Sequence, residues 1–243
     1  ILIRSLGRAH HSAFGESKNN ALLNLIDLLN RAMDSGFDLR MTHMQGGTCS
    51  NQAPDLAVAE CYLTSHQLED FKRFFVEYRV RQSREEGSEA GSGDGARFEL
   101  ELGGLGETGI SFLPQTWFKA INDIVQLIQI EEKDFQTKPE DAFDPAFATI
   151  SLIQIRPALG KTEMILDWRL LPNQNSDEVF AGFSRKIFEV GTKYKDLNLK
   201  AEVIRMNPSF HCSETHEWIK NCGDAMERAG LMPNLDASSL SSE

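Results

Sequence analysis

Apolar and polar positions divide the chain into two stretches that predict nearly the same order of elements. In the first stretch, the predicted elements are a strand at 1–6, a helix at 19–33, strands at 37–44 and 56–63, and a helix at 66–84. The helices show apolar residues at intervals of three and four, and the half-buried strands alternate apolar with polar residues. The predicted order is therefore β-α-β-β-α.

The second stretch repeats this order and adds a closing strand. Its predicted elements are a strand at 97–102, a helix at 115–130, strands at 147–156 and 161–170, a helix at 176–194 and a strand at 197–206. A repeat of this length indicates two copies of one supersecondary unit. Each copy has the composition of a split β-α-β layer, in which helices cover one face of an antiparallel sheet.

The predicted fold class is α+β, with two tandem ferredoxin-like (β-α-β-β-α) modules, each a two-layer α/β sandwich. The first module spans 1–84 and the second spans 97–206. Residues 85–96 are rich in Gly, Ser and Glu and contain almost nothing apolar, which is typical of a flexible linker. Residues 207–243 contain one amphipathic helix, at 215–229, and no closing strand, as expected for the start of a further domain.

Composition restricts the classes of partner and the compartment. Twenty-five Lys and Arg against thirty-six Asp and Glu give 25 − 36 = −11, which argues against nucleic acid and anionic membranes as partners. No apolar run approaches the roughly 18 residues that span a bilayer. The four cysteines form no C-x-x-C pair, and the chain opens at Ile1 without the pattern of a signal peptide. We therefore expect a cytoplasmic protein with free thiols, and the opening at Ile1 suggests native sequence upstream.

Two loops of the first module carry candidate chemistry. His10 and His11 follow the first strand; adjacent side chains diverge, so a joint metal site is geometrically poor, and an ordinary surface loop is the simpler interpretation. The segment G-G-T-C-S-N-Q-A-P at 46–54 places Asn51 in a turn. Its amide offers a donor and an acceptor to a ligand, or else caps its own backbone.

The second module contributes L-D-W-R-L-L-P at 166–172, where Arg169 ends a strand. An arginine in this place binds a carboxylate with two parallel hydrogen bonds. The simpler interpretation is a surface ion pair between Asp167 and Arg169, which share one face of the strand.

Together these motifs resemble a known family. G-x-x-x-H-S, the N-A-x-x-x-L helix, G-G-T-x-x-N-x-A-P and L-D-W-R-L-L-P look like the lid of the zinc-dependent superfamily of aminoacylases, acetylornithine deacetylases and dipeptidases. The double lid is most similar to the aminoacyl-histidine dipeptidase (carnosinase-type) branch. The resemblance covers about 1–206, and 207–243 looks like the re-entry into the catalytic domain.

The resemblance implies roles for three residues. His11 would stabilise the oxyanion of the scissile carbonyl, Asn51 would bind the substrate backbone, and Arg169 would hold the substrate's C-terminal carboxylate; whether His10 or His11 faces the substrate stays open. In the family, the Asn and the Arg usually belong to one lid copy. Here they are split, because Thr64 occupies the Arg position of the first copy and Arg156 the Asn position of the second. Glu107 stands near the position that corresponds to His11, so two fused lids would do the work of two subunits.

The resemblance also implies what this chain does not contain. The family's two zinc ions are held by ligands of the catalytic domain, so we expect no metal site here and no activity of the chain by itself. The implied parent is a zinc dipeptidase that hydrolyses substrates such as Xaa-His, with the dipeptide and its own catalytic domain as partners and a homodimer as a possibility. Two alternatives are the lid of an N-acyl amino-acid deacylase and a tandem ferredoxin-like module that binds a small metabolite.

Overall fold

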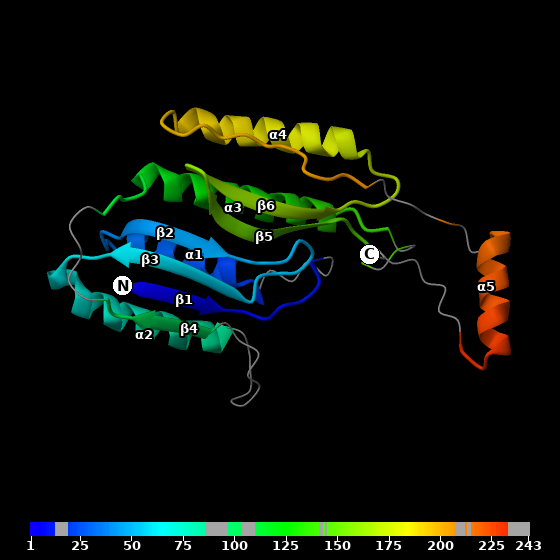
Figure 1. The fold of residues 1–243 in the computed structure, drawn as a ribbon, viewed down its shortest axis with the longest axis horizontal. Coiled ribbons are helices and arrows are strands. Elements are labelled where there is room, and N and C mark those ends of the chain that lie inside the picture. The colour runs from blue at the N-terminus through cyan, green and yellow to red at the C-terminus, as the bar shows by residue number, and fades with distance from the viewer. Residues whose placement is uncertain are drawn as a thin grey trace.

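The structure is a computed structural model that describes residues 1–12, 19–85, 97–103, 110–140, 143, 145–207, 212 and 215–232. Its centre is a single antiparallel sheet of six strands in the order β4-β1-β3-β2-β5-β6 (Figure 1). The strands are β1 (Leu2–Leu6), β2 (Arg40–Gly46), β3 (Leu56–Tyr62), β4 (Arg97–Glu101), β5 (Thr149–Ala158) and β6 (Lys161–Arg169). The helices are α1 (Ala21–Asp34), α2 (Leu68–Glu85), α3 (Gln115–Gln136), α4 (Ser176–Lys193) and α5 (Glu217–Arg228), with a short 3-10 turn at Ser65–Gln67 before α2.

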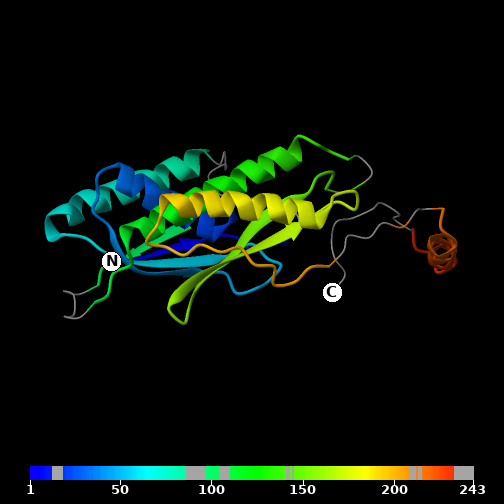
Figure 2. The ribbon, with the colours of Figure 1, turned by 90° about the horizontal axis from the view of Figure 1, so that it is seen from above.

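Helices α1 to α4 all cover the same face of the sheet (Figure 2). This arrangement has two layers, and it confirms the predicted α+β class. The apolar stripe of each helix and the alternate residues of the strands meet in one core. Fully buried members include Ile3, Leu25, Leu29, Phe71, Phe98, Phe118, Ile150 and Leu152.

The first four strands in chain order form a complete ferredoxin-like sheet by themselves. Strand β1 lies between β3 and β4, and its residues Leu2 to Leu6 pair with Glu101 to Arg97 on β4. The sequence pattern groups 97–102 with the second predicted module, whereas β4 pairs with β1 of the first. The alternation of a strand shows which face is buried, but it does not specify the neighbour with which the strand pairs.

The second half adds α3, the hairpin β5–β6 and α4 to the edge of β2. One residue pair, Gly46 with Ile155, joins β2 to β5 in the sheet. The segment 197–206, which the sequence predicts to be a strand, forms none in the structure. Leu197, Leu199 and Ala201 instead pack against the core as an extended segment, so the apolar alternation of this segment is satisfied without backbone pairing.

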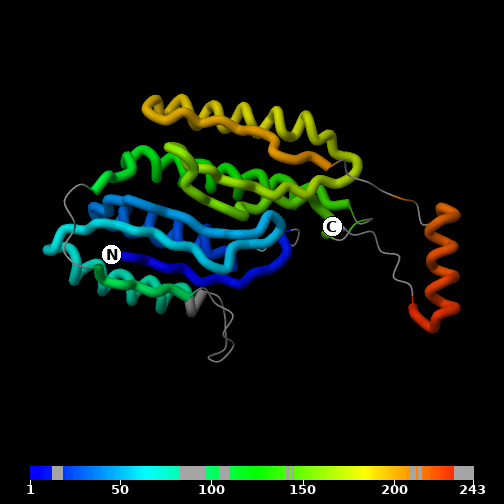
Figure 3. Tube along the Cα trace, viewed as in Figure 1, coloured from blue at the N-terminus to red at the C-terminus, as the bar shows by residue number. Residues whose placement is uncertain are grey.

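The predicted helix near residue 220 is present as α5, and it stands apart from the sheet in the trace of Figure 3. None of the helices in the described ranges is both long enough and apolar enough to cross a membrane. One sheet contains strands of both predicted modules. The domain boundaries that the sequence suggests remain predictions.

Candidate functional site

The candidate residues gather at the end of the sheet where β1 and β2 both finish. The loop after β1 carries His11, and the loop between β2 and β3 carries Asn51. Strand β5 continues past the end of β2, and β6 ends beside the start of β5, since Thr149 pairs with Arg169. Segments that are far apart in the sequence therefore reach one place, which we call the seam: residues 7–12, 46–54, 149–154 and 166–169.

Gly47 allows β2 to approach β5 closely. Its φ is +77°, a left-handed conformation that residues with a Cβ rarely adopt. A Cβ at this position would lie 1.9 Å from the carbonyl oxygen of Ile153. The side chain of Gln154 donates to the Gly47 carbonyl oxygen (2.9 Å) and fastens the same contact. The double glycine thus has a packing role at the junction of the two halves.

Asn20 links the start of α1 to the second half. Its side-chain oxygen accepts from the N–H groups of Leu22 and Leu23 and so caps the helix. Its amide Nδ2 donates to the carbonyl oxygen of Leu152 (2.7 Å). Asn20 is 2% exposed, so this asparagine of the N-A-x-x-x-L motif satisfies buried backbone groups on two elements.

Backbone hydrogen bonds hold the His11 loop against the Asn51 loop. The Ser12 N–H donates to the Asn51 carbonyl oxygen (3.0 Å), and the Ala53 N–H donates to the His10 carbonyl oxygen (2.9 Å). His11 and Gln52 form the antiparallel bridge between these two bonds. His11 and Asn51 therefore lie on neighbouring backbones, although forty residues separate them in sequence.

Ser12 connects this pair of loops to β5 and β6. Its hydroxyl is within hydrogen-bonding distance of the Asn51 carbonyl oxygen (3.0 Å) and of Asp167 Oδ2. A hydroxyl has one proton to donate, and the carboxylate is the stronger acceptor of the two. Ser151 in turn donates to the Ser12 carbonyl oxygen (3.0 Å). The loops are thus bonded to both strands of the hairpin.

Arg169 lies in the same network. Its Nε–H donates to Asp167 Oδ2 (2.8 Å), and the two side chains are 15% and 18% exposed. The expected Asp167–Arg169 pair is present, but it is mostly buried rather than a surface pair. Trp168 points to the other face of β6, where it contacts Phe135 of α3 and Phe183 of α4. The alternation of the strand therefore places Asp167 and Arg169 on the face without helices.

Other residues that the sequence brings into consideration do not join the seam. Thr64 lies beyond the far end of β3, and Arg156 pairs with Glu163 (2.8 Å) farther along the hairpin. His10 Nδ1 is 3.0 Å from the Arg8 carbonyl oxygen, and which histidine faces a substrate remains a prediction. Glu107 and most of the predicted linker, 86–96, fall outside the described residues.

Sequence reasoning missed the contributions of Ser12 and Ser151, and it treated Asp167 only as a surface partner of Arg169. Ser12 is 1% exposed, and such burial of a hydroxyl requires hydrogen-bond partners. The serine of H-S and the aspartate of D-x-R are part of the motifs. Nothing in their spacing, 155 residues apart, indicates that they meet.

The described residues do not fit a zinc ion. No group of three or more His, Cys, Asp or Glu side chains that could hold a metal is found in the part of the chain that the structure describes. His216, one of the histidines near the C-terminus, accepts a hydrogen bond from the Trp218 N–H (3.2 Å) at the start of α5. No chemical step at zinc follows from these residues.

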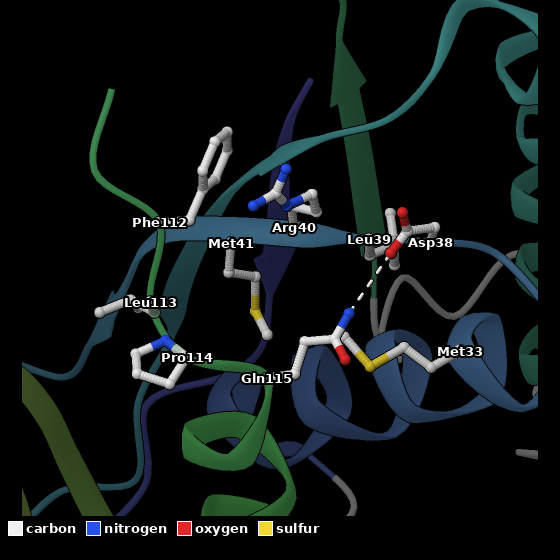
Figure 4. A pocket seen from close by; sticks show the side chains of 9 residues that line it. All are labelled: Met33, Asp38, Leu39, Arg40, Met41, Phe112, Leu113, Pro114 and Gln115. Carbon is white, nitrogen blue, oxygen red and sulfur yellow. Dashed lines mark hydrogen bonds between the residues drawn. The ribbon is translucent and has the colours of Figure 1, made fainter. Parts of the chain in front are cut away.

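A cavity of about 410 Å³ lies at the opposite end of β2 (Figure 4). Met33 and Met41 provide part of its apolar lining, and the Arg40 guanidinium lies 4.1 Å above the ring of Phe112. Gln115, at the start of α3, bonds to Asp38 across it. The residues that line this cavity do not belong to the seam, so it is a separate feature.

Comparison with known proteins gives a fold relationship. No protein-family model matches the chain, and no curated protein matches it. The crystal structure of aminoacylhistidine dipeptidase from Vibrio alginolyticus is similar, with a TM-score of 0.57 and 16% sequence identity. The likeness covers 79% of this chain and 37% of the dipeptidase chain, so this chain spans little more than a third of that protein's length. The chain therefore shares its fold with a part of an aminoacylhistidine dipeptidase.

Proposed function

We propose that this chain is the tandem lid of a zinc-dependent dipeptidase and that its seam supplies side chains to the peptide substrate. The observation that carries this proposal is the convergence of the segments that carry His11, Asn51 and Arg169. These residues come from three distant segments, and Ser12 and Asp167 bond the segments together. The sequence motifs point to the same three residues independently of their positions in space.

The chemistry of each side chain suits the binding of a dipeptide. Arg169 carries a permanent positive charge for a C-terminal carboxylate. Asn51 offers both a donor and an acceptor to a peptide group. A histidine N–H at His11 would donate to the carbonyl oxygen as it gains negative charge, and a donor in such a position is worth a few kcal/mol in the transition state. The dipeptidase likeness supports this assignment.

The catalytic metal in this proposal belongs to another part of the protein, and the proposed partners are that catalytic part, the dipeptide and, for a homodimer, a second copy. The metal supplies the activated water when bound. The lid residues bind and orient the substrate and donate hydrogen bonds. With −11 net charge, neither nucleic acid nor an anionic membrane is a proposed partner, and the proposed location is the cytoplasm.

Kinetics of the full-length protein test the proposal. We expect zinc-dependent hydrolysis of glycyl-histidine and at least a roughly 100-fold loss of kcat in His11→Ala. His66→Ala is a matched control, because His66 lies in the turn before α2, away from the seam. Unchanged turnover in His11→Ala would remove the role of His11, and the absence of dipeptide hydrolysis in the wild type would contradict the proposal. Faster cleavage of acetyl-amino acids than of dipeptides would favour the deacylase alternative.

The cavity at the opposite end of β2 favours a second candidate function, a small-metabolite-binding module. Its volume of about 410 Å³ is within the range of small-molecule sites. Arg40 and Asp38 would offer charge there, and Met41 and Phe112 apolar surface. This alternative predicts saturable binding at Arg40 rather than at Arg169, which makes the two functions separable by the position of the bound ligand.

A further inference from the structure

The carboxylate of Asp167 joins two segments of the seam, 7–12 and 166–169. One oxygen atom, Oδ2, accepts from the Nε–H of Arg169 on its own strand and from the hydroxyl of Ser12 in the loop after β1. The first contact joins neighbours on β6, whereas the second spans 155 residues. The Asp167 carboxylate therefore connects the segment that carries His11 to the segment that carries Arg169 by hydrogen bonds.

Burial makes this link stronger than a surface ion pair. Ser12 is 1% exposed, and the Asp167 and Arg169 side chains are 18% and 15% exposed. Hydrogen bonds between a charged acceptor and its donors gain strength where water is largely excluded. Because Ser12 directly follows His11, its bond to Asp167 helps to fix the backbone beside the histidine, together with the Ser12 N–H bond to Asn51.

We infer that Asp167 is a positioning residue. It sets the direction of the Arg169 guanidinium and the place of the His11–Ser12 segment, so that both are arranged around the same substrate. The inference rests on the proposed function and deepens it. Asp167 itself touches no substrate in this role. Its effect passes through Arg169 to the binding of the substrate carboxylate and through Ser12 to the placement of His11. Ser12 is the second positioning residue of the same link.

The effect through Arg169 and the effect through Ser12 predict different kinetic changes in the full-length protein. Asp167→Asn keeps the size of the side chain and removes its charge, so we expect KM for glycyl-histidine to rise about tenfold and kcat to fall. Ser12→Ala leaves the Asp167–Arg169 pair in place and removes the hydroxyl that ties the His11 segment to it, so we expect a lower kcat with a smaller change in KM. Because the two residues share one bond, the double variant should lose little more than Asp167→Asn alone. General weakening of the fold would lower the active fraction without raising KM.

Glu163→Gln is the matched control. Glu163 also accepts from an arginine across the β5–β6 hairpin, with Arg156 Nε at 2.9 Å. It lies four residues from Asp167 on the same strand, roughly 13 Å away. The control removes a carboxylate from the same face but leaves the Ser12 link intact, so KM and kcat should stay at wild-type values. Wild-type kinetics in Asp167→Asn, or strictly additive losses in the double variant, would overturn the inference.

A measurement on the chain itself keeps the geometry separate from the activity. The Arg169 Nε–H should give a shifted NMR signal that exchanges slowly with water, and Asp167→Asn should abolish that protection. In Ser12→Ala the signal should move, and in Glu163→Gln it should not. An unchanged signal in both seam variants would overturn the link even in an active enzyme. Absence of hydrolysis by the wild type would instead overturn the proposed function, and with it the role of Asp167 in catalysis.

Discussion

At the scale of single residues, burial decides which charges the fold tolerates. Glu132 of α3 is half-buried, and this burial raises the pKa of its carboxyl from 4.5 to about 6, while the neighbouring Lys133 lowers it slightly. The protonated form is therefore favoured in the folded state relative to the unfolded chain. The contribution of Glu132 to the free energy of unfolding is fully present below about pH 4.5 and is lost as the pH rises through about 6.

Glu132→Gln tests this burial. The variant keeps the shape and removes the ionisation, so at about pH 7 it should be more stable than the wild type by about 1 kcal/mol, after discounting for the solvent that reaches the side chain. At about pH 4 the difference should largely vanish, because the wild-type carboxyl is then mostly protonated in both states. Urea unfolding at the two pH values measures this difference in the free energy of unfolding. A difference that is equal at both pH values would show that ionisation is not its cause.

At the scale of elements, the glycines and asparagines of the motifs join the two halves of the sheet. Gly47 lets the end of β2 touch the backbone of β5, and Asn20 ties the start of α1 to Leu152. The β2–β5 junction has one ladder pair, Gly46 with Ile155. The close approach at Gly47 is therefore one of the contacts that hold β5 against β2, together with the burial of Ile155 in the core.

Gly47→Ala should therefore destabilise the fold by about 3 kcal/mol or more, since a Cβ would meet the Ile153 carbonyl oxygen in addition to the strain of a positive φ. Gly36→Ala is the matched control. Gly36 follows α1 with a φ of +91°, but its Cβ would meet nothing within 4 Å. Gly36→Ala should lower the free energy of unfolding by only about 1 kcal/mol. Thermal and urea unfolding compare the two, and equal losses would mean that the junction at Ile153 is not tight.

The elements themselves are largely predictable from the sequence, and their neighbours are not. Periodicity locates α1, α3, α4 and both strands of the second hairpin to within a few residues, except that α3 runs to Gln136. Asn175 caps α4, because its side-chain oxygen accepts from the N–H groups of Asp177 and Glu178. The pairing of β4 with β1 escapes prediction for a different reason, because strand alternation reports burial and not partners.

At the scale of the whole molecule, one sheet carries both halves and brings the motif residues to one end of it. The resemblance of the motifs nominates His11, Asn51 and Arg169, and the choice between His10 and His11 stays a prediction. That their segments converge cannot be predicted from the motifs, because the bond between Ser12 and Asp167 depends on how β5 meets β2. The likeness to part of a dipeptidase concerns this arrangement of helices and strands. The roles of the side chains belong to the proposed function.

The most direct test of the proposed dipeptide site is an NMR titration of this chain with glycyl-histidine. Binding by the lid without its catalytic part should be weak, in the millimolar range, with shifts confined to residues 8–12, 47–53 and 167–169. Arg169→Gln should abolish these shifts, since the substrate carboxylate loses its cation. Shifts around Arg40 and Phe112, or no shifts at the seam at tens of millimolar peptide, would contradict the claim that these side chains form one dipeptide site.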